Sequence, residues 1–291
     1  MDTEALAVLS QAAASGSLSG AARRLGLSPT LASRRLAALE AQLGVRLVNR
    51  TTRSLSLTPE GLAFLPHARA MLEAETSALG SLAGGIGAVS GLLRVTAPAS
   101  FGRKVVAPLI PGLLQAYPAL RVQLSLQDRM VDIVGEGFDL AVRIGRLRDS
   151  SLLARKLADN PRRLCAAPAY LQRHGTPRTL ADLADHQRLG LIDRAAWPFV
   201  TGGAVREVRF EGRFESDSME AVHVACLAGL GIATFSYWDV EVELAAGTLR
   251  EVVLEDAAPE PVAIWVVRPA SPQTPPKLAP FIAALEVRLQ V

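Results

Sequence analysis

The chain has 291 residues, of which 49% are hydrophobic, and this is enough for more than one buried core. The formal net charge is only +3, so a uniformly polycationic protein is excluded and any surface for nucleic acid must be local. The first residues have no basic segment followed by an apolar run, and no apolar stretch approaches the ~20 residues of a membrane helix. We therefore expect a cytoplasmic protein that does not bind a membrane.

Three helices are expected at the amino terminus. Residues 2–14 have a helical pattern, and residues 18–25 form a second, shorter one. Gly26 then breaks the helix, because glycine adopts a positive φ without steric cost. Ser28 is a good N-cap, and Pro29 suits the first helical position, where its missing N–H costs nothing. Two helices joined by such a tight turn form a helix-turn-helix.

The second helix of this pair has a polar outer face. Its apolar side chains face inward, which leaves Thr30, Ser33, Arg34 and Arg35 to point outward, where they can donate hydrogen bonds to bases and phosphates. Residues 23–53 contain seven arginines and one carboxylate, Glu40. Such a local excess attracts phosphate. The alternative for any single arginine is a solvated surface charge, but the combination with the turn favours DNA binding.

A small hairpin, or wing, is expected after Gly44. Val45, Leu47, Leu55 and Leu57 alternate with polar residues. The tip of this wing consists of Arg50, Thr51, Thr52 and Arg53.

The first sixty residues resemble the winged helix-turn-helix of LysR-type transcriptional regulators. The residues that carry this resemblance are Ala21-Ala22-Arg23-Arg24-Leu25, Ser28, Ser33-Arg34, Leu39-Glu40, Leu43-Gly44, Leu47, Arg50 and Leu57-Thr58-Pro59-Glu60-Gly61. Many members of the family have glutamine at the position of Pro29, where its side chain can contact a base. Pro29 has no polar side chain and cannot make this contact. The resemblance implies a DNA-binding domain over residues 1–58, with double-stranded DNA contacted by Ser28, Pro29, Thr30, Ser33, Arg34, Arg35, Arg50, Thr51, Thr52 and Arg53.

A long helix is expected from Pro59. An apolar stripe at seven-residue spacing runs along it, formed by Leu65, Leu72 and Leu79 with Ala68 and Leu82. One interpretation is that this stripe packs on its own chain. The resemblance implies instead a linker helix, within residues 59–90, that pairs with a second subunit in a homodimer, with a homotetramer as a further assembly. The glycine-rich segment 80–91 is expected to be a hinge.

From residue 91 onward, strand-like and helical runs alternate, which predicts an α/β fold with a parallel sheet. We expect strands at 92–97, 121–126 and 140–144, with helices at 103–117 and 131–136. Further strands are expected near Arg155, Leu164, Leu189, Val208, Ala233, Val252 and Ile264, and further helices at 169–174, 219–227, 237–245 and 277–289.

The segments Gly91-x-Leu93-Arg94-Val95, Phe138-Asp139-Leu140-Ala141 and Gly229-Leu230-Gly231-Ile232-Ala233 resemble the effector domain of the same family. The resemblance implies two α/β lobes like those of a periplasmic binding protein. Lobe I would comprise residues 91–160 and 263–291, and lobe II residues 161–262.

A small-molecule effector is expected beyond the carboxyl ends of the strands. The candidate residues are Ser100, Phe101, Gln127, Arg143, Gly145, Phe199, Asp217 and Phe235. Ser100 is equally well explained as an N-cap, Arg143 as an ion-pair partner of Asp139 or Glu136, and the aromatic residues as core. Asp217 and Glu220 resemble a capping box. We expect a small organic acid or aromatic compound as the effector.

No enzyme motif is present in the sequence. The four histidines are scattered without the spacing of a zinc site, and no phosphate-binding loop or dinucleotide fingerprint occurs, so no cofactor is expected. His223 and Cys226 lie three residues apart, but packed cysteine is the ordinary outcome, as it is for Cys165. The resemblance therefore implies a non-enzymatic regulator that also contacts RNA polymerase. The alternatives are an architectural DNA-binding protein whose large domain serves only assembly, and an enzyme with a DNA-binding head.

Overall fold

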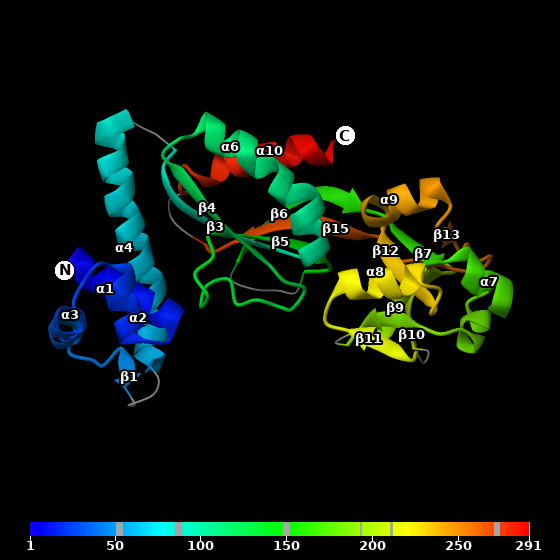
Figure 1. Cartoon of the computed structure of the whole chain (residues 1–291), viewed down its shortest axis with the longest axis horizontal. Helices are drawn as coiled ribbons and strands as arrows, with labels where there is room; N and C mark the ends of the chain where they lie inside the picture. The colour runs from blue at the N-terminus through cyan, green and yellow to red at the C-terminus, as the bar shows by residue number, and fades with distance from the viewer. Residues whose placement is uncertain are drawn as a thin grey trace.

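The computed structural model describes residues 1–50, 55–84, 89–147, 152–192, 194–209, 212–270 and 274–290. Three parts follow one another along the long axis of the molecule: an amino-terminal head, lobe I and lobe II, with helix α4 leading from the head to lobe I (Figure 1). The head is mainly helical and both lobes are α/β. This is the fold class that the sequence predicts.

The head is built around the helix-turn-helix. Its elements are α1 (Thr3–Ser15), α2 (Leu18–Arg24), α3 (Pro29–Leu43), β1 (Val48–Arg50) and β2 (Leu55–Leu57). Gly26 has φ +67° in the turn, and the Oγ of Ser28 accepts a hydrogen bond from Leu31 N at 3.2 Å. The predicted break, N-cap and helix start at Pro29 are confirmed. Leu36 and Leu39 of α3 lie in the core between α1 and α3.

The wing is fixed to α3 by one carboxylate. Oε1 of Glu40 accepts hydrogen bonds from the backbone N–H groups of Leu47 and Val48 at 2.8 and 3.1 Å. The strands β1 and β2 that follow pair antiparallel, with Arg50 opposite Leu55. The wing is therefore held at a set position beside the outer face of α3.

Helix α4 (Pro59–Gly84) packs on its own head along its first half. Leu65 and Ala68 are 1% and 0% exposed in the head core, and Leu72 packs against the same core. This part of the apolar stripe therefore packs on its own chain, which is the first of the two interpretations given in the sequence analysis. The side chains of Leu79 and Leu82, and residues 85–88 of the expected hinge, lie outside the described residues. Pairing of α4 with a second subunit therefore stays a prediction.

Lobe I contains a five-stranded sheet in the order β4-β3-β5-β15-β6. Its strands are β3 (Gly91–Ala97), β4 (Leu120–Leu126), β5 (Leu140–Gly145), β6 (Leu153–Asn160) and β15 (Val262–Arg268). Strand β3 is parallel to β4 and β5, as expected, but β15 runs antiparallel to both β5 and β6. The sheet is mixed because β15 enters lobe I from the opposite direction, on its return from lobe II.

The helix expected at 103–117 begins earlier and is irregular. It consists of α5 (Ala99–Phe101), a π-helical turn η1 (Gly102–Val106), a 3₁₀ turn η2 (Ala107–Leu109) and α6 (Ile110–Ala116). Pro108 and Pro111 lack the N–H of a regular helix, which accounts for the change of helix type between them. Together with α10 (Leu278–Leu289), this segment covers the apolar core of lobe I.

The prediction of a helix at 131–136 is wrong. These residues form turns, in which Oδ1 of Asp132 accepts a hydrogen bond from Gly135 N at 2.9 Å. Gly137 follows with φ +71°. A short polar side chain that bonds to nearby backbone, together with two glycines, favours turns over a helix, although Val131 and Ile133 are buried.

Lobe II contains three small sheets, ordered β12-β7-β13, β10-β9-β14 and β11-β8. Its elements are β7 (Arg162–Ala166), α7 (Pro168–His174), η3 (Ala181–Asp185), β8 (Leu189–Leu191), β9 (Ala196–Thr201), β10 (Ala204–Arg209), β11 (Phe214–Ser216), α8 (Met219–Leu227), β12 (Ile232–Ser236), α9 (Tyr237–Ala246), β13 (Arg250–Glu251) and β14 (Ala258–Pro259). The chain leaves lobe I after Asn160 and returns at Val262, and these two residues pair with each other. Both connections between the lobes therefore lie side by side.

Gly61→Ala tests how closely α4 approaches the wing. A Cβ at Gly61 would lie 2.0 Å from the carbonyl oxygen of Leu47, so the variant should lose about 1–3 kcal/mol of stability from overpacking. Gly112→Ala is the control, because a Cβ at this position in α6 has nothing within 4 Å. Thermal unfolding measures both variants. Equal melting temperatures for the two would show that the wing shifts away from α4 without cost.

Candidate functional site

The outer face of α3 presents the side chains expected to contact DNA. Thr30 and Arg34 are exposed, and Ser33 is half-buried beside them. Ser28 and Pro29 are also exposed at the helix start, but the Ser28 hydroxyl already caps the helix by accepting from Leu31 N. The most prominent charged donor of this face is therefore Arg34.

Arg35 differs from Arg34 in having partners within the head. Its Nη1 lies 2.8 Å from Oδ2 of Asp2, and its Nη2 pairs with Glu4. Both carboxylates lie at the start of α1, so Arg35 ties α3 to α1. Two neighbouring carboxylates also weaken the attraction of this guanidinium for phosphate.

The remaining expected DNA contacts are at the wing. Arg50 ends β1, opposite Leu55 of β2. Thr51, Thr52 and Arg53 lie outside the described residues, so their roles stay predictions.

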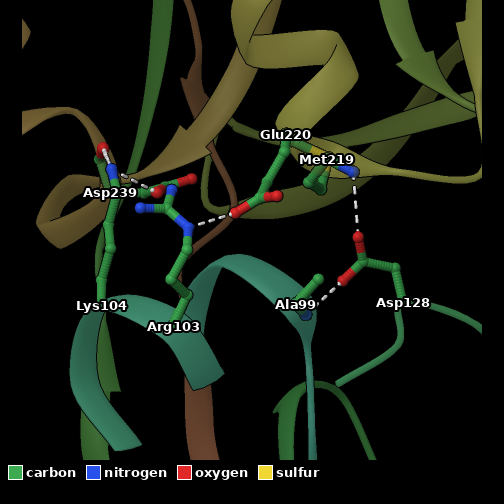
Figure 2. Close-up of polar contacts among 7 residues, drawn as sticks. All are labelled: Ala99, Arg103, Lys104, Asp128, Met219, Glu220 and Asp239. Atoms are coloured by element: carbon green, nitrogen blue, oxygen red, sulfur yellow. Dashed lines mark hydrogen bonds and ion pairs between the residues drawn. The ribbon is translucent and has the colours of Figure 1, made fainter. Parts of the chain in front are cut away.

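One carboxylate joins the two lobes at the start of two helices. Oδ1 of Asp128 accepts a hydrogen bond from Ala99 N of lobe I at 2.8 Å, and Oδ2 accepts from Met219 N of lobe II at 3.0 Å (Figure 2). Helix starts attract anions because their N–H groups have no partner within the helix. Here the protein's own carboxylate already occupies that position.

Two ion pairs add to this contact between the lobes (Figure 2). Nε of Arg103 donates to Oε1 of Glu220 at 2.6 Å, and this hydrogen bond raises the pKa of Arg103. Nζ of Lys104 lies 2.9 Å from Oδ1 of Asp239, which is 5% exposed, and donates to the Asp239 carbonyl oxygen at 2.5 Å. The first pair is open to solvent and contributes little, whereas the second is better shielded.

A cavity of about 110 Å³ lies between the lobes. Lobe I contributes Gly145 from the end of β5, and lobe II contributes Arg162, Arg194 and Thr234. Glu260 also lines the cavity and accepts a hydrogen bond from Nε of Arg146 at 2.9 Å. The cavity thus contains polar groups that come from distant parts of the sequence.

Arg162 is the most unusual group in this cavity. Burial, together with the nearby charge of Arg194, lowers its pKa to about 10. Nη2 of Arg162 donates to the carbonyl oxygen and Oγ1 of Thr234 at 2.8 and 3.1 Å. A poorly solvated guanidinium beside a second one gains electrostatic energy from an anion, so this cavity suits a carboxylate.

Of the expected effector residues in lobe I, Gly145 lines this cavity. Ser100 is 6% exposed, and Phe101 is fully buried against Trp238, with ring centroids 5.1 Å apart. Gln127 precedes Asp128 and lies 3.5 Å from Ser125 Oγ. Phe101 thus contacts lobe II through Trp238, whereas neither Ser100 nor Gln127 lines the cavity between the lobes.

Arg143 is held inside lobe I. Its Nη2 donates to the carbonyl oxygen of Val131 at 3.3 Å, and burial lowers its pKa. The carboxylates considered as its partners have other contacts, because Asp139 pairs with Lys277 and Glu136 with Arg129.

In lobe II, Phe199 and Phe235 lie in two hydrophobic cores, both 0% exposed, and neither lines the cavity between the lobes. Asp217 is exposed. The expected capping box between Asp217 and Glu220 is wrong, because Ser218 is the N-cap of α8 and makes no side-chain cap. Asp128 takes the first N–H of this helix instead, and Glu220 pairs with Arg103.

Comparison with known proteins decides the family. Residues 3–62 match the family model described as "Bacterial regulatory helix-turn-helix protein, lysR family", and residues 87–290 match "LysR substrate binding domain". The chain belongs to the LysR family. As a LysR-type transcriptional regulator, it combines a helix-turn-helix DNA-binding domain with an effector-binding domain, and it is not an enzyme.

Relatives of known name and structure agree with this assignment. The transcriptional regulator DmlR of Escherichia coli is 38% identical over 84% of this chain and 81% of its own length. CrgA of Neisseria meningitidis, also a LysR-type regulator, is 31% identical in its solved structure, with a TM-score of 0.63 over 100% of both chains. The full-length structure of AphB, a virulence activator of Vibrio cholerae, is 28% identical with a TM-score of 0.60 over 98% of both chains.

Two polar residues of the cavity, Arg162 and Arg194, were not expected from the sequence. Arg162 directly follows the crossing between the lobes at Asn160 and precedes the apolar run of β7. Its position, as a charged residue just after the point where the chain passes from lobe I to lobe II, is the sequence feature that could have identified it as a cavity residue. Nothing in the sequence shows that Arg194, in a loop thirty residues later, faces the same cavity.

Within the described residues, no helix is both long and apolar enough to cross a membrane, and no group of three His, Cys, Asp or Glu side chains is placed to hold a metal ion.

Cys165 and Cys226 are free thiols with 0% exposure. Burial raises the pKa of each to about 12. Sγ of Cys226 lies 3.4 Å from the carbonyl oxygen of Cys165, and His223 lies 3.5 Å from Glu243. Since the thiolate is the reactive form, these cysteines fit packing and neither catalysis nor redox sensing.

The folded protein should accordingly resist thiol reagents. Its two cysteines are protonated at pH 8, because their pKa values lie near 12, and they are also inaccessible. Titration with a chromogenic disulfide reagent should detect neither thiol in the native protein and both in denaturant. Rapid reaction of Cys226 in the native state would contradict the assignment of these cysteines to packing.

Proposed function

We propose that this LysR-family protein is a sequence-specific, dimeric DNA-binding regulator in the cytoplasm, whose binding to DNA is modulated by a small organic acid in the cavity between its lobes. The observation that carries the effector part is the half-buried guanidinium of Arg162 beside Arg194, with its lowered pKa. An aromatic acid suits the same cavity, because Trp197 forms part of its wall.

Exposed basic side chains support the DNA-binding part. Arg34 projects from the outer face of α3, and Arg23 and Arg24 are exposed on the last turn of α2. Helix α3 has the position of a recognition helix in the major groove, where arginine contacts guanine with two hydrogen bonds. The two arginines of α2 suit phosphates beside the groove.

Helix α4 supports the dimer. Leu65 and Ala68 are buried against the head, but Leu62 and Met71, which flank this buried stripe on its two sides, are 55% and 41% exposed. Exposed apolar side chains on a long helix favour pairing with a second copy. Two-fold pairing would present two heads to a two-fold DNA site, and a tetramer of two such dimers and contact with RNA polymerase complete the proposal.

Ligand binding would act through the junction between the lobes. An acid bound beside Arg162 and Arg194 makes new contacts with lobe II. The Asp128 contact meanwhile holds the starts of α5 and α8 together. A change in the angle between the lobes follows, and the dimer carries it to the heads.

Arg34→Ala should weaken DNA binding by ~1–3 kcal/mol and relax the preference at one base position, because a bidentate contact to a base is lost. Arg35→Ala is the matched control, and it should have a smaller effect because Arg35 already pairs with Asp2 and Glu4. Binding to an operator series with single base changes measures both. Equal weakening across all operators would assign Arg34 to a phosphate.

Arg194→Gln should remove the response to the effector while DNA affinity survives, because one of the two guanidinium groups at the cavity is lost. A panel of small organic acids is first tested for a thermal shift of the wild type, and the active compound is then titrated against the variant. Arg206→Gln, on the exposed strand β10 away from this cavity, is the control. An unchanged dose response in Arg194→Gln would place the effector elsewhere, and a parallel titration of Ser100→Ala tests the nearest expected alternative.

If no compound shifts the melting temperature, the effector part of the proposal is contradicted. The large domain would then serve assembly of an architectural DNA-binding protein.

A further inference from the structure

A second cavity, of about 200 Å³, lies where the head, α4 and lobe I meet. Its wall includes Ser10 of α1 and Arg69 of α4 on one side, and Arg94 of β3, Arg121 of β4 and Lys277 on the other. This cavity is separate from the one between the lobes. A molecule bound in it would touch all three of the parts that meet there.

Positive charge dominates this cavity. Arg69, Arg94, Arg121 and Lys277 all line it, and none of the lining residues within the described chain is Asp or Glu. One carboxylate lies behind the wall: Asp139 accepts hydrogen bonds from Lys277 Nζ at 2.9 Å and from Arg94 N at 2.7 Å. It balances the charge of Lys277.

Arg94 has unused hydrogen-bonding capacity. Its Nε is buried, and no partner for this atom occurs in the described part of the chain. A buried donor without a partner costs free energy, which an acceptor in the cavity would recover. Arginine donates from a planar fork that matches carboxylate and phosphate oxygens.

Arg69 joins the parts that surround the cavity. Its Nε lies 3.4 Å from Ser10 Oγ in the head, and its Nη1 lies 3.3 Å from the carbonyl oxygen of Val134 in lobe I. Gly137 makes this approach possible, because a Cβ there would lie 2.0 Å from Nη1 of Arg69. The guanidinium is thus held at the junction by both sides.

We infer that this cavity is a second ligand site, which binds a small oxyanion with two negative charges, such as inorganic phosphate or a short dicarboxylate. Its volume suits an anion of this size. Three guanidinium groups and an ammonium group from different parts of the fold would converge on its oxygens. Bound anion stabilises the contact between α4 and lobe I, and so fixes the head relative to the effector domain.

The site is tested by calorimetric titration of the full-length protein with phosphate and, separately, with succinate at constant ionic strength set by chloride. We expect saturable binding of at least one of the two. Arg121→Gln should weaken binding of that anion by about tenfold or more, because a charge-assisted contact is lost. Arg121 is exposed, so this substitution should not prevent folding. Arg94→Gln should have a similar effect.

Two control variants separate this site from the cavity between the lobes. Binding should persist in Arg206→Gln, a lobe II surface change, and in Arg194→Gln, which alters the other cavity. Binding that is lost in Arg194→Gln but kept in Arg121→Gln belongs to the effector cavity and overturns this inference, while it supports the proposed function. Absence of saturable binding by both anions also overturns it.

Discussion

The chain crosses between the two lobes of this regulator at one place, where the last residue of β6 pairs with the first residue of β15. Asn160 at this point is 0% exposed, and both ends of its side chain are used: Nδ2 donates to Ser236 Oγ at 2.8 Å, and Oδ1 accepts from Trp238 Nε1 at 2.9 Å. Since both chain crossings share this junction, lobe II can move relative to lobe I only about it. Small contacts beside the junction therefore have large effects on the angle between the lobes.

Two kinds of contact lie beside that junction. On one side the protein neutralises its own groups, since Asp128 satisfies the N–H groups of two helix starts and Asp239 pairs with Lys104. On the other side Arg162 and Arg194 place two guanidinium groups at the cavity, and burial lowers the pKa of Arg162. The first set holds the lobes together without a ligand, whereas the proposed effector would complete the second. This asymmetry is what makes the cavity between the lobes a regulatory site in our account.

Signals that act within a few residues were readable in the sequence. Gly26, Ser28 and Pro29 determine the turn and the start of α3 through their own backbone preferences, so the helix-turn-helix was predicted correctly. Strands β3, β4 and β5 of lobe I were predicted to within one residue of their bounds, and the resemblance to the LysR family supplied the two-lobed architecture.

Features that depend on distant partners were not readable. The start of α8 is capped by Asp128, ninety-one residues away, so the local Asp217–Glu220 pattern gave a wrong capping box. The turns at 131–136 were expected as a helix, although Asp132 and the glycines at 135 and 137 favour turns. Phe199 and Phe235 were expected on a cavity wall, but an aromatic residue in a strand does not reveal whether its face is core or cavity.

The central claim is that an acid in the cavity between the lobes changes how a dimer contacts DNA. Footprinting of the purified protein on the DNA upstream of its own gene, with and without a panel of small organic acids, tests it most directly. The account predicts protection of two related half-sites and a change in that protection with at least one acid. A footprint of a single site, or one that no acid alters, would contradict it.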